Sequence, residues 1–171
     1  MAQLVLTVVG DDRAGLVSAL AERVSAAGAN WEQSELAELA GAFAGIVLVS
    51  VPDDRVAELT ASLRSLDGLL NVAVHSGSAV EGRQSEQART LEITVLGNDR
   101  PGIVRDVTSA IAAHALSIDT FRSRTLEAPM AGGTLFEATA GIQLPHDADA
   151  TQIARALEAL AGEIQVDLTI A

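Results

Sequence analysis

The chain has 171 residues, 49% of them apolar and only 2% aromatic, with 23 acidic residues against 11 basic ones and a formal net charge of −12. Such a chain can build packed cores but repels polyanions, so we expect no direct binding to nucleic acid or to an anionic membrane. Lysine and cysteine are absent, which excludes Schiff-base chemistry, a P-loop lysine, a thiolate nucleophile and a cysteine zinc site.

The first half of the chain alternates between strand-like and helix-like periodicity. Short runs rich in β-branched and aliphatic residues predict strands, and apolar residues three or four apart predict helices. The expected elements are a strand over 4–9, a helix ending near Ala27 with Gly28 as its stop, strands over 31–39 and 43–51 joined by a tight turn at 40–41, a second helix after Pro52, and a strand over 69–74.

The second half repeats the first. Residues 97–103, Gly-Asn-Asp-Arg-Pro-Gly-Ile, match residues 10–16, Gly-Asp-Asp-Arg-Ala-Gly-Leu, at an offset of 97 − 10 = 87. The apolar face of the following helix keeps the same offset, so the similarity of two short turns is not a coincidence. The expected elements are a strand over 91–96, a helix ending near Ala113, strands over 118–126 and 135–144, a helix with Ile153, Leu157 and Leu160 on its inner face, and a strand over 164–170.

The order βαββαβ, twice over, predicts an α+β protein with two ferredoxin-like domains, each a four-stranded antiparallel sheet with two helices on one face. We expect domains over 1–76 and 90–171, with a polar linker over 77–89. The strands carry apolar residues at both odd and even positions, and therefore on both faces of the sheet. We expect the second sheet face to be at least partly buried by the sister domain or by another subunit of a homo-oligomer. The N-terminus lacks a cationic signal region and no apolar run reaches about 20 residues, which favours a cytoplasmic protein.

A βαββαβ unit with Asp-Arg-Pro-Gly-Ile (99–103) between its first strand and first helix resembles the ACT domain, a small-molecule-binding regulatory module common in amino-acid metabolism. Two such units with no catalytic domain resemble the glycine cleavage system transcriptional repressor group, and Phe-Arg-Ser-Arg-Thr at 121–125 has a similar layout there. The resemblance implies a non-catalytic regulator that binds a small amino acid, with glycine or serine as the leading ligands, and acts through a protein partner in indirect transcriptional control.

The resemblance also implies where the ligand lies. In ACT domains it contacts the strand-to-helix turn, helped by a polar residue at the start of the second strand, typically at an interface between two domains. Ala14 departs from the family pattern, which has proline, and Ser117 stands where asparagine is expected. The implied ligand-binding residues are Asp12, Arg13, Ala14, Gly15, Leu16 and Asn30 in the first copy and Asp99, Arg100, Pro101, Gly102, Ile103 and Ser117 in the second.

The turn also suits a zwitterion on physical grounds. The unpaired amide groups of a helix beginning at Gly15 or Gly102 attract a carboxylate, and Asn30, Asp11 or Asp12 can accept hydrogen bonds from an ammonium group. The structural alternative is that Asp12 and Asp99 cap the helices, that the glycines only supply a positive φ, and that Arg13 and Arg100 form surface ion pairs.

Two other functions stay open from the sequence. One is a ligand-independent dimerisation or adaptor module. The other is an acylphosphatase-like hydrolase, in which Arg13 would bind phosphate and Asn30 would orient water, although Asp11 and Asp12 would repel a dianion. His75, His114 and His146 lie on separate elements without paired ligand spacing, so we expect no metal site. We also expect no cofactor and no catalytic residues.

Overall fold

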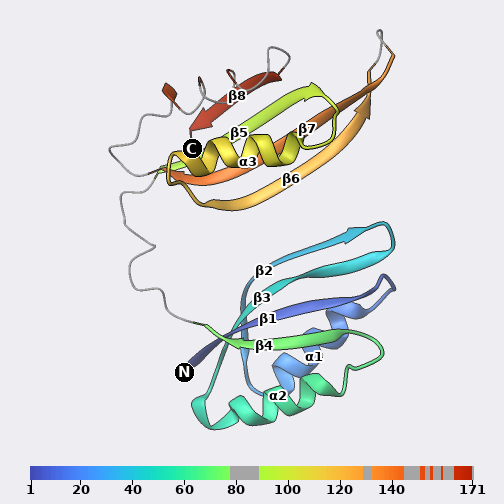
Figure 1. Ribbon diagram of the computed structural model, residues 1–171. Helices are drawn as coiled ribbons and strands as arrows, with labels where there is room; N and C mark the ends of the chain where they lie inside the picture. Colours follow the sequence, from blue (N-terminus) through green and yellow to red (C-terminus); the bar gives the residue numbers. More distant parts are fainter. Residues whose placement is uncertain are drawn as a thin grey trace. The chain divides into compact units, whose positions relative to one another are not determined.

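The computed structural model describes residues 1–77, 89–128, 132–144, 151–152, 155, 159 and 164–170. The chain divides into two compact units, Met1–Glu81 and Gly82–Ala171 (Figure 1). Residues 78–88, nearly all of the expected linker, lie outside the described part of the chain. The domain limits and the linker therefore stay predictions.

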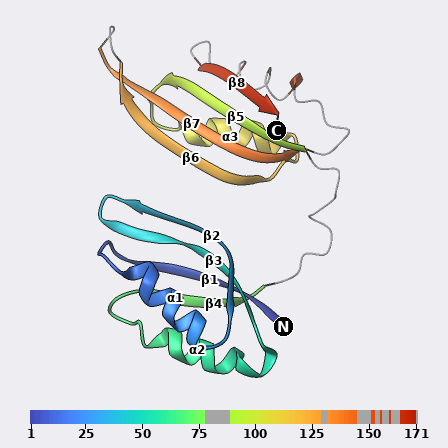
Figure 2. The ribbon, with the colours of Figure 1, turned by 180° about the vertical axis from the view of Figure 1, so that it is seen from behind.

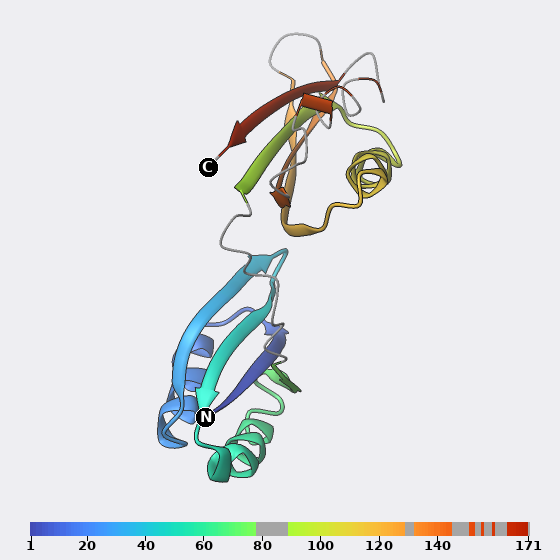
Figure 3. The same cartoon turned by 90° about the vertical axis from the view of Figure 1, so that its left-hand side faces the viewer.

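The first unit has the expected βαββαβ order. Its elements are β1 (Ala2–Asp11), α1 (Leu16–Ala26), β2 (Asn30–Leu39), β3 (Ala42–Val51), the 3₁₀ turn η1 (Asp53–Arg55), α2 (Val56–Arg64) and β4 (Asn71–Ser76). The strands form one antiparallel sheet in the order β2-β3-β1-β4. Both helices lie on the same face of this sheet, which Figures 2 and 3 show from behind and from the side.

The second unit repeats this topology. Its elements are β5 (Arg89–Asn98), α3 (Ile103–Ala113), β6 (Ile118–Glu127), β7 (Thr134–Leu144) and β8 (Ile164–Ile170), in the antiparallel order β6-β7-β5-β8. The predicted fold class, two ferredoxin-like α+β domains, is confirmed. The second helix expected here has Ile153, Leu157 and Leu160 on its inner face, and these three residues lie outside the described ones.

Each unit has its own core, placed between its sheet and α1 and α2 in the first unit and between its sheet and α3 in the second. Leu4, Leu6 and Val8 alternate along β1 and are buried together with Leu16, Leu20 and Val24 of α1. The second core repeats this pattern with residues of β5, α3 and β7. Because successive strand residues point to opposite faces, the alternation fixes which face of each sheet packs on the helices.

The equivalent helices α1 and α3 differ in the residue that follows the C-cap. Gly28 follows α1 with φ +65°; its N–H donates to the Ser25 carbonyl, and the Ala29 N–H donates to the Val24 carbonyl, which together form a Schellman motif. The equivalent position, 28 + 87 = 115, is Ala115, which adopts φ +57°. A left-handed conformation is unfavourable for alanine, because its Cβ crowds the backbone.

Ala115→Gly is therefore expected to stabilise the second unit by about 0.5–1 kcal/mol, the strain relieved less the extra chain entropy of glycine. Urea unfolding measures the change. Gly28→Ala is the matched control, with a loss of similar size in the first unit. A destabilised Ala115→Gly variant would contradict the assigned backbone conformation.

Candidate ligand site

The first strand-to-helix turn is held between the end of β1 and the β2–β3 hairpin. Gly15 is the N-cap of α1 and has φ +91°, a conformation that favours glycine. The Asp12 N–H donates to the Gly41 carbonyl over 2.8 Å, and in the second unit the Asp99 N–H donates to the Thr134 carbonyl over 2.8 Å. Both copies thus build the turn in the same way.

The amides that open α1 are available to an acceptor. The first helical hydrogen bond runs from the Ala19 N–H to the Gly15 carbonyl, so the N–H groups of Leu16, Val17 and Ser18 precede it and have no partner within the helix. No acidic residue lies in the first turn of α1, and its N-cap has no side chain. The helix N-caps are Gly15 and Gly102, so the hypothesis that Asp12 and Asp99 are the capping residues is wrong.

Arg13 and Asp11 lie side by side at the mouth of this turn. The Arg13 guanidinium is 3.5 Å from the Asp11 carboxylate, and their side chains are 51% and 89% exposed. Such an exposed and long ion pair contributes little to stability. The Arg13 guanidinium is therefore able to exchange this contact for a ligand carboxylate, and the Asp11 carboxylate for a ligand ammonium group.

A hollow of about 220 Å³ adjoins the turn. Its lining consists of Val9, Gly10, Asp11, Arg13, Gly68, Leu69, Leu70 and Asn71. A Cβ at Gly10 would lie 2.6 Å from the Leu69 carbonyl oxygen, so only glycine lets β1 pass this close to the loop before β4. The hollow reaches the two charged side chains but is not lined by Gly15 or Leu16.

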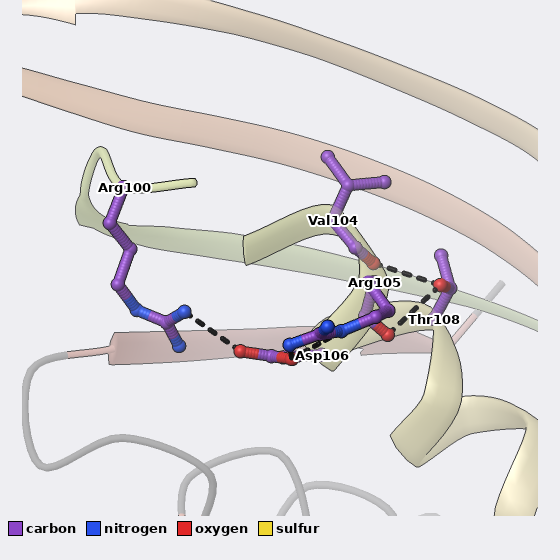
Figure 4. A network of polar contacts seen from close by, with 5 residues as sticks. All are labelled: Arg100, Val104, Arg105, Asp106 and Thr108. Atoms are coloured by element: carbon purple, nitrogen blue, oxygen red, sulfur yellow. Dashed lines mark hydrogen bonds and ion pairs between the residues drawn. The ribbon is translucent and has the colours of Figure 1, made fainter. Parts of the chain in front are cut away.

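The second turn is closed by an ion pair that the first turn lacks. The Arg100 guanidinium donates to the Asp106 carboxylate over 2.8 Å, and Arg105 donates to its other oxygen over 3.0 Å (Figure 4). The equivalent of Asp106 in the first unit, 106 − 87 = 19, is Ala19, and the equivalent of Asp11 is Asn98. The second turn thus has its arginine engaged and no carboxylate at the position of Asp11.

The pH dependence of this ion pair follows from its hydrogen bonds. Those from Arg100, and secondarily from Arg105, hold the pKa of Asp106 below its usual value. A lowered carboxyl pKa adds stability that is fully present above the usual pKa and is lost as the pH falls through the lowered one. We expect the stability difference between the wild type and Asp106→Asn to be constant from about pH 7 to 5 and to shrink below about pH 4. Urea unfolding at each pH tests this, and a difference that already falls between pH 7 and 5 would contradict it.

Asn30 does not share a site with the turn of its own unit. It begins β2 opposite Ser50, which pairs with Gln3, whereas Asp11 at the other end of β1 pairs with Ala42. The two ends are separated by about 26 Å at 3.3 Å per residue. The Asn30 amide donates to Glu32 over 2.9 Å, and the Ser50 hydroxyl donates to the same carboxylate over 2.6 Å.

These two hydrogen bonds, with that from Ser50 the larger cause, lower the pKa of Glu32 and fix its carboxylate as an acceptor. Ser117 lies likewise just before β6, at the end of its sheet away from Asp99. Within each unit the turn residues come together, and Asn30 and Ser117 lie apart from them. Their roles in ligand binding stay predictions.

Other candidates from the sequence have local structural roles. His75 contacts the Thr7 hydroxyl at 3.3 Å, His114 is the C-cap of α3, and His146 lies outside the described residues. In the part of the chain that the structure describes, no three or more acidic or histidine side chains cluster as a metal site would require, and no helix is long and apolar enough to span a membrane.

Sequence reasoning missed two features of the site. The ion pair between Arg100 and Asp106 was detectable, because aligning the copies at the 87-residue offset sets Asp106 against Ala19. The wall formed by residues 68–71 had no signal in the sequence, since it depends on how closely β1 passes the loop before β4.

Two ferredoxin-like units, each with an Asp-Arg turn between its first strand and first helix, define a class of small regulatory domain. Residues 2–76 and 89–170 each match the ACT domain family model, and the chain belongs to the ACT domain family. The glycine cleavage system transcriptional repressor of Escherichia coli K12 is 26% identical over 167 residues, which cover 98% of this chain and 88% of that protein. The repressor of Shigella flexneri matches to the same extent.

Solved structures show the same fold. An unknown protein from Galdieria sulphuraria is 31% identical with a TM-score of 0.85, and the match covers 99% of this chain and 98% of that one. A structure assigned provisionally as a glycine cleavage system transcriptional repressor is 21% identical with a TM-score of 0.71 and covers 99% and 97% of the two chains. The chain is thus a tandem ACT-domain protein related to the glycine cleavage system repressor.

Proposed function

We propose that this protein is a non-catalytic, cytoplasmic sensor that binds a small amino acid at the first strand-to-helix turn and passes the signal to a protein partner. Its membership of the ACT family and its relation to a transcriptional repressor support a regulatory role. The observation that carries the proposal is the loose pair of Arg13 and Asp11 beside a hollow of about 220 Å³.

The chemistry of this turn fits both ends of an α-amino acid. Arg13 would bind the carboxylate, assisted by the open amides of α1, and Asp11 would bind the ammonium group. The hollow is smaller than the sites of about 300 to 1,000 Å³ that hold drug-sized ligands, which favours glycine or serine. The first turn is the better site, because the equivalent arginine in the second turn is already paired with Asp106.

Control of transcription through this protein would be indirect. Its charge of −12 opposes contact with DNA, and arginine is its only strongly basic residue type. A protein partner of opposite surface charge would then carry the DNA-binding function. Retention of duplex DNA by the purified chain at physiological salt would overturn this part of the proposal.

A screen of thermal stability against the common amino acids tests the proposal. Saturation at about 100 times the dissociation constant adds about 2.7 kcal/mol to the stability of the binding unit, so a small amino acid should raise its melting temperature by several degrees. A flat response to all of them, with partner binding intact, would favour the ligand-independent adaptor.

The hydrolase alternative loses its geometric basis. It needs Arg13 and Asn30 at one phosphate, and these residues lie at opposite ends of the same sheet. Hydrolysis of an acyl phosphate that disappears in Arg13→Ala would restore this alternative.

A further inference from the structure

The two sheets differ in the face that lies away from their helices, here called the free face. In the first unit its centre is apolar. It carries Val5, Thr7 and Val9 from β1, Ala44, Ile46 and Leu48 from β3, Gln33, Glu35 and Ala37 from β2, and Ala73 and His75 from β4. Val9 and Ile46 are each 50% exposed, and a shallow hollow of about 200 Å³ lies among Val5, Ile46 and Leu48.

Most equivalent positions of the second unit lose their apolar side chains, although Leu96 keeps the place of Val9 apolar. Where the first free face has Val5, Ala44, Ile46 and Leu48, the second has Glu92, Glu137, Thr139 and Gly141. Arg124 and Glu137 form an ion pair across this face with a 2.6 Å contact. In each unit the core lies on the opposite face of the sheet, so packing of the core does not explain this contrast.

We propose that the free face of the first sheet binds the same face of a second copy of this chain, forming a symmetric dimer of stacked sheets. Three ten-residue strands and the shorter β4 make a surface of roughly 19 by 33 Å, or about 600 Å² per copy. A stacked pair would bury about 1,200 Å² in total, the lower end of specific protein interfaces. The proposal does not depend on the proposed function.

The polar side chains at the rim favour one orientation of the two copies. Glu35 lies on edge strand β2 and His75 on edge strand β4, at opposite edges of the free face. A two-fold axis parallel to the strands sets each β2 edge over the partner's β4 edge, which brings the carboxylate and the imidazole together. An axis perpendicular to the strands would stack β2 on β2 and oppose two glutamates, which is unfavourable. We therefore assign the axis parallel to the strands.

Ile46→Asp tests the interface, with Thr139→Asp at the equivalent position of the second unit as the matched control. The wild type and Thr139→Asp are expected to be dimers in sedimentation velocity, and Ile46→Asp a monomer with the dissociation constant raised at least 100-fold. Circular dichroism and urea unfolding check that both variants fold. Ile46 does not line the ligand hollow, so amino-acid binding should survive in Ile46→Asp. A monomeric wild type, or equal loss in both variants, would overturn the proposal.

Cross-linking tests the orientation, and the absence of native cysteine makes it specific. The double variant Glu35→Cys, His75→Cys should form a covalent dimer with a thiol-reactive cross-linker spanning roughly 10 Å, the distance between stacked sheets. Glu35→Cys alone should form none, because the two β2 edges lie on opposite sides of the dimer. Efficient cross-linking of Glu35→Cys alone, or none in the double variant, would overturn the assigned axis.

Discussion

Arg13→Ala is expected to weaken binding of the small amino acid by about 10- to 100-fold, since a hydrogen bond to a charged group contributes about 1.5–3 kcal/mol. Arg13 is half exposed and makes only a 3.5 Å contact with Asp11, so its removal should hardly change the stability of the unliganded protein. Isothermal titration calorimetry with glycine and serine measures the affinity.

Arg100→Ala is the matched control, because Arg100 is the equivalent residue and is held by Asp106. It is expected to leave the affinity of the first site unchanged and to destabilise the second unit slightly. An equal loss of affinity in both variants would show that the two turns contribute together to ligand binding. An unchanged affinity in Arg13→Ala would remove this turn from the site.

Ala19→Asp is expected to close the first turn and to lower its affinity at least tenfold. The substitution puts a carboxylate where Asp106 lies in the second unit, at the fourth helical position, within reach of Arg13. Arg13 would then be paired in the absence of ligand, and the new charge would repel a ligand carboxylate.

The reciprocal change, Asp106→Ala, should free Arg100. Calorimetric titration of Ala19→Asp, Asp106→Ala and the double variant with glycine or serine shows whether the residue at this helical position decides which turn binds the amino acid. Ala19 is partly buried against the first core, so urea unfolding of Ala19→Asp is needed to separate closure of the turn from loss of folding. A folded Ala19→Asp variant with wild-type affinity would contradict the closing role of this ion pair.

The repeat made most of the fold predictable. Apolar residues at strand and helix spacing identified every described strand and α-helix, and the glycines at 15, 28 and 102 marked three places where the chain takes a positive φ. These features depend on local preferences and on burial of one face, and both are written in the spacing of residues. Ala40 and Ala115 are the exceptions, because both adopt the left-handed conformation without being glycine.

The relation between the site residues was less predictable. Asp12, Arg13 and Gly15 are neighbours in the chain and stay together in the fold, whereas Asn30 lies beyond the whole length of α1 and opens β2 at the far end of the sheet. In the βαββαβ topology β1 and β2 run in the same direction, so the end of one strand and the start of the other are separated by the length of the sheet. Comparing the directions of β1 and β2 therefore places Asn30 and the turn at opposite ends of the sheet.

By itself the sequence determined the repeated α+β units, the strongly acidic character and the glycine-bounded turn, because composition and periodicity carry this information directly. Tertiary structure alone decided that Gly10 must pass the Leu69 carbonyl and that the apolar free face belongs to the first sheet. These features depend on which segments meet across the sheet, and such contacts arise only when strands distant in the chain pair in one register.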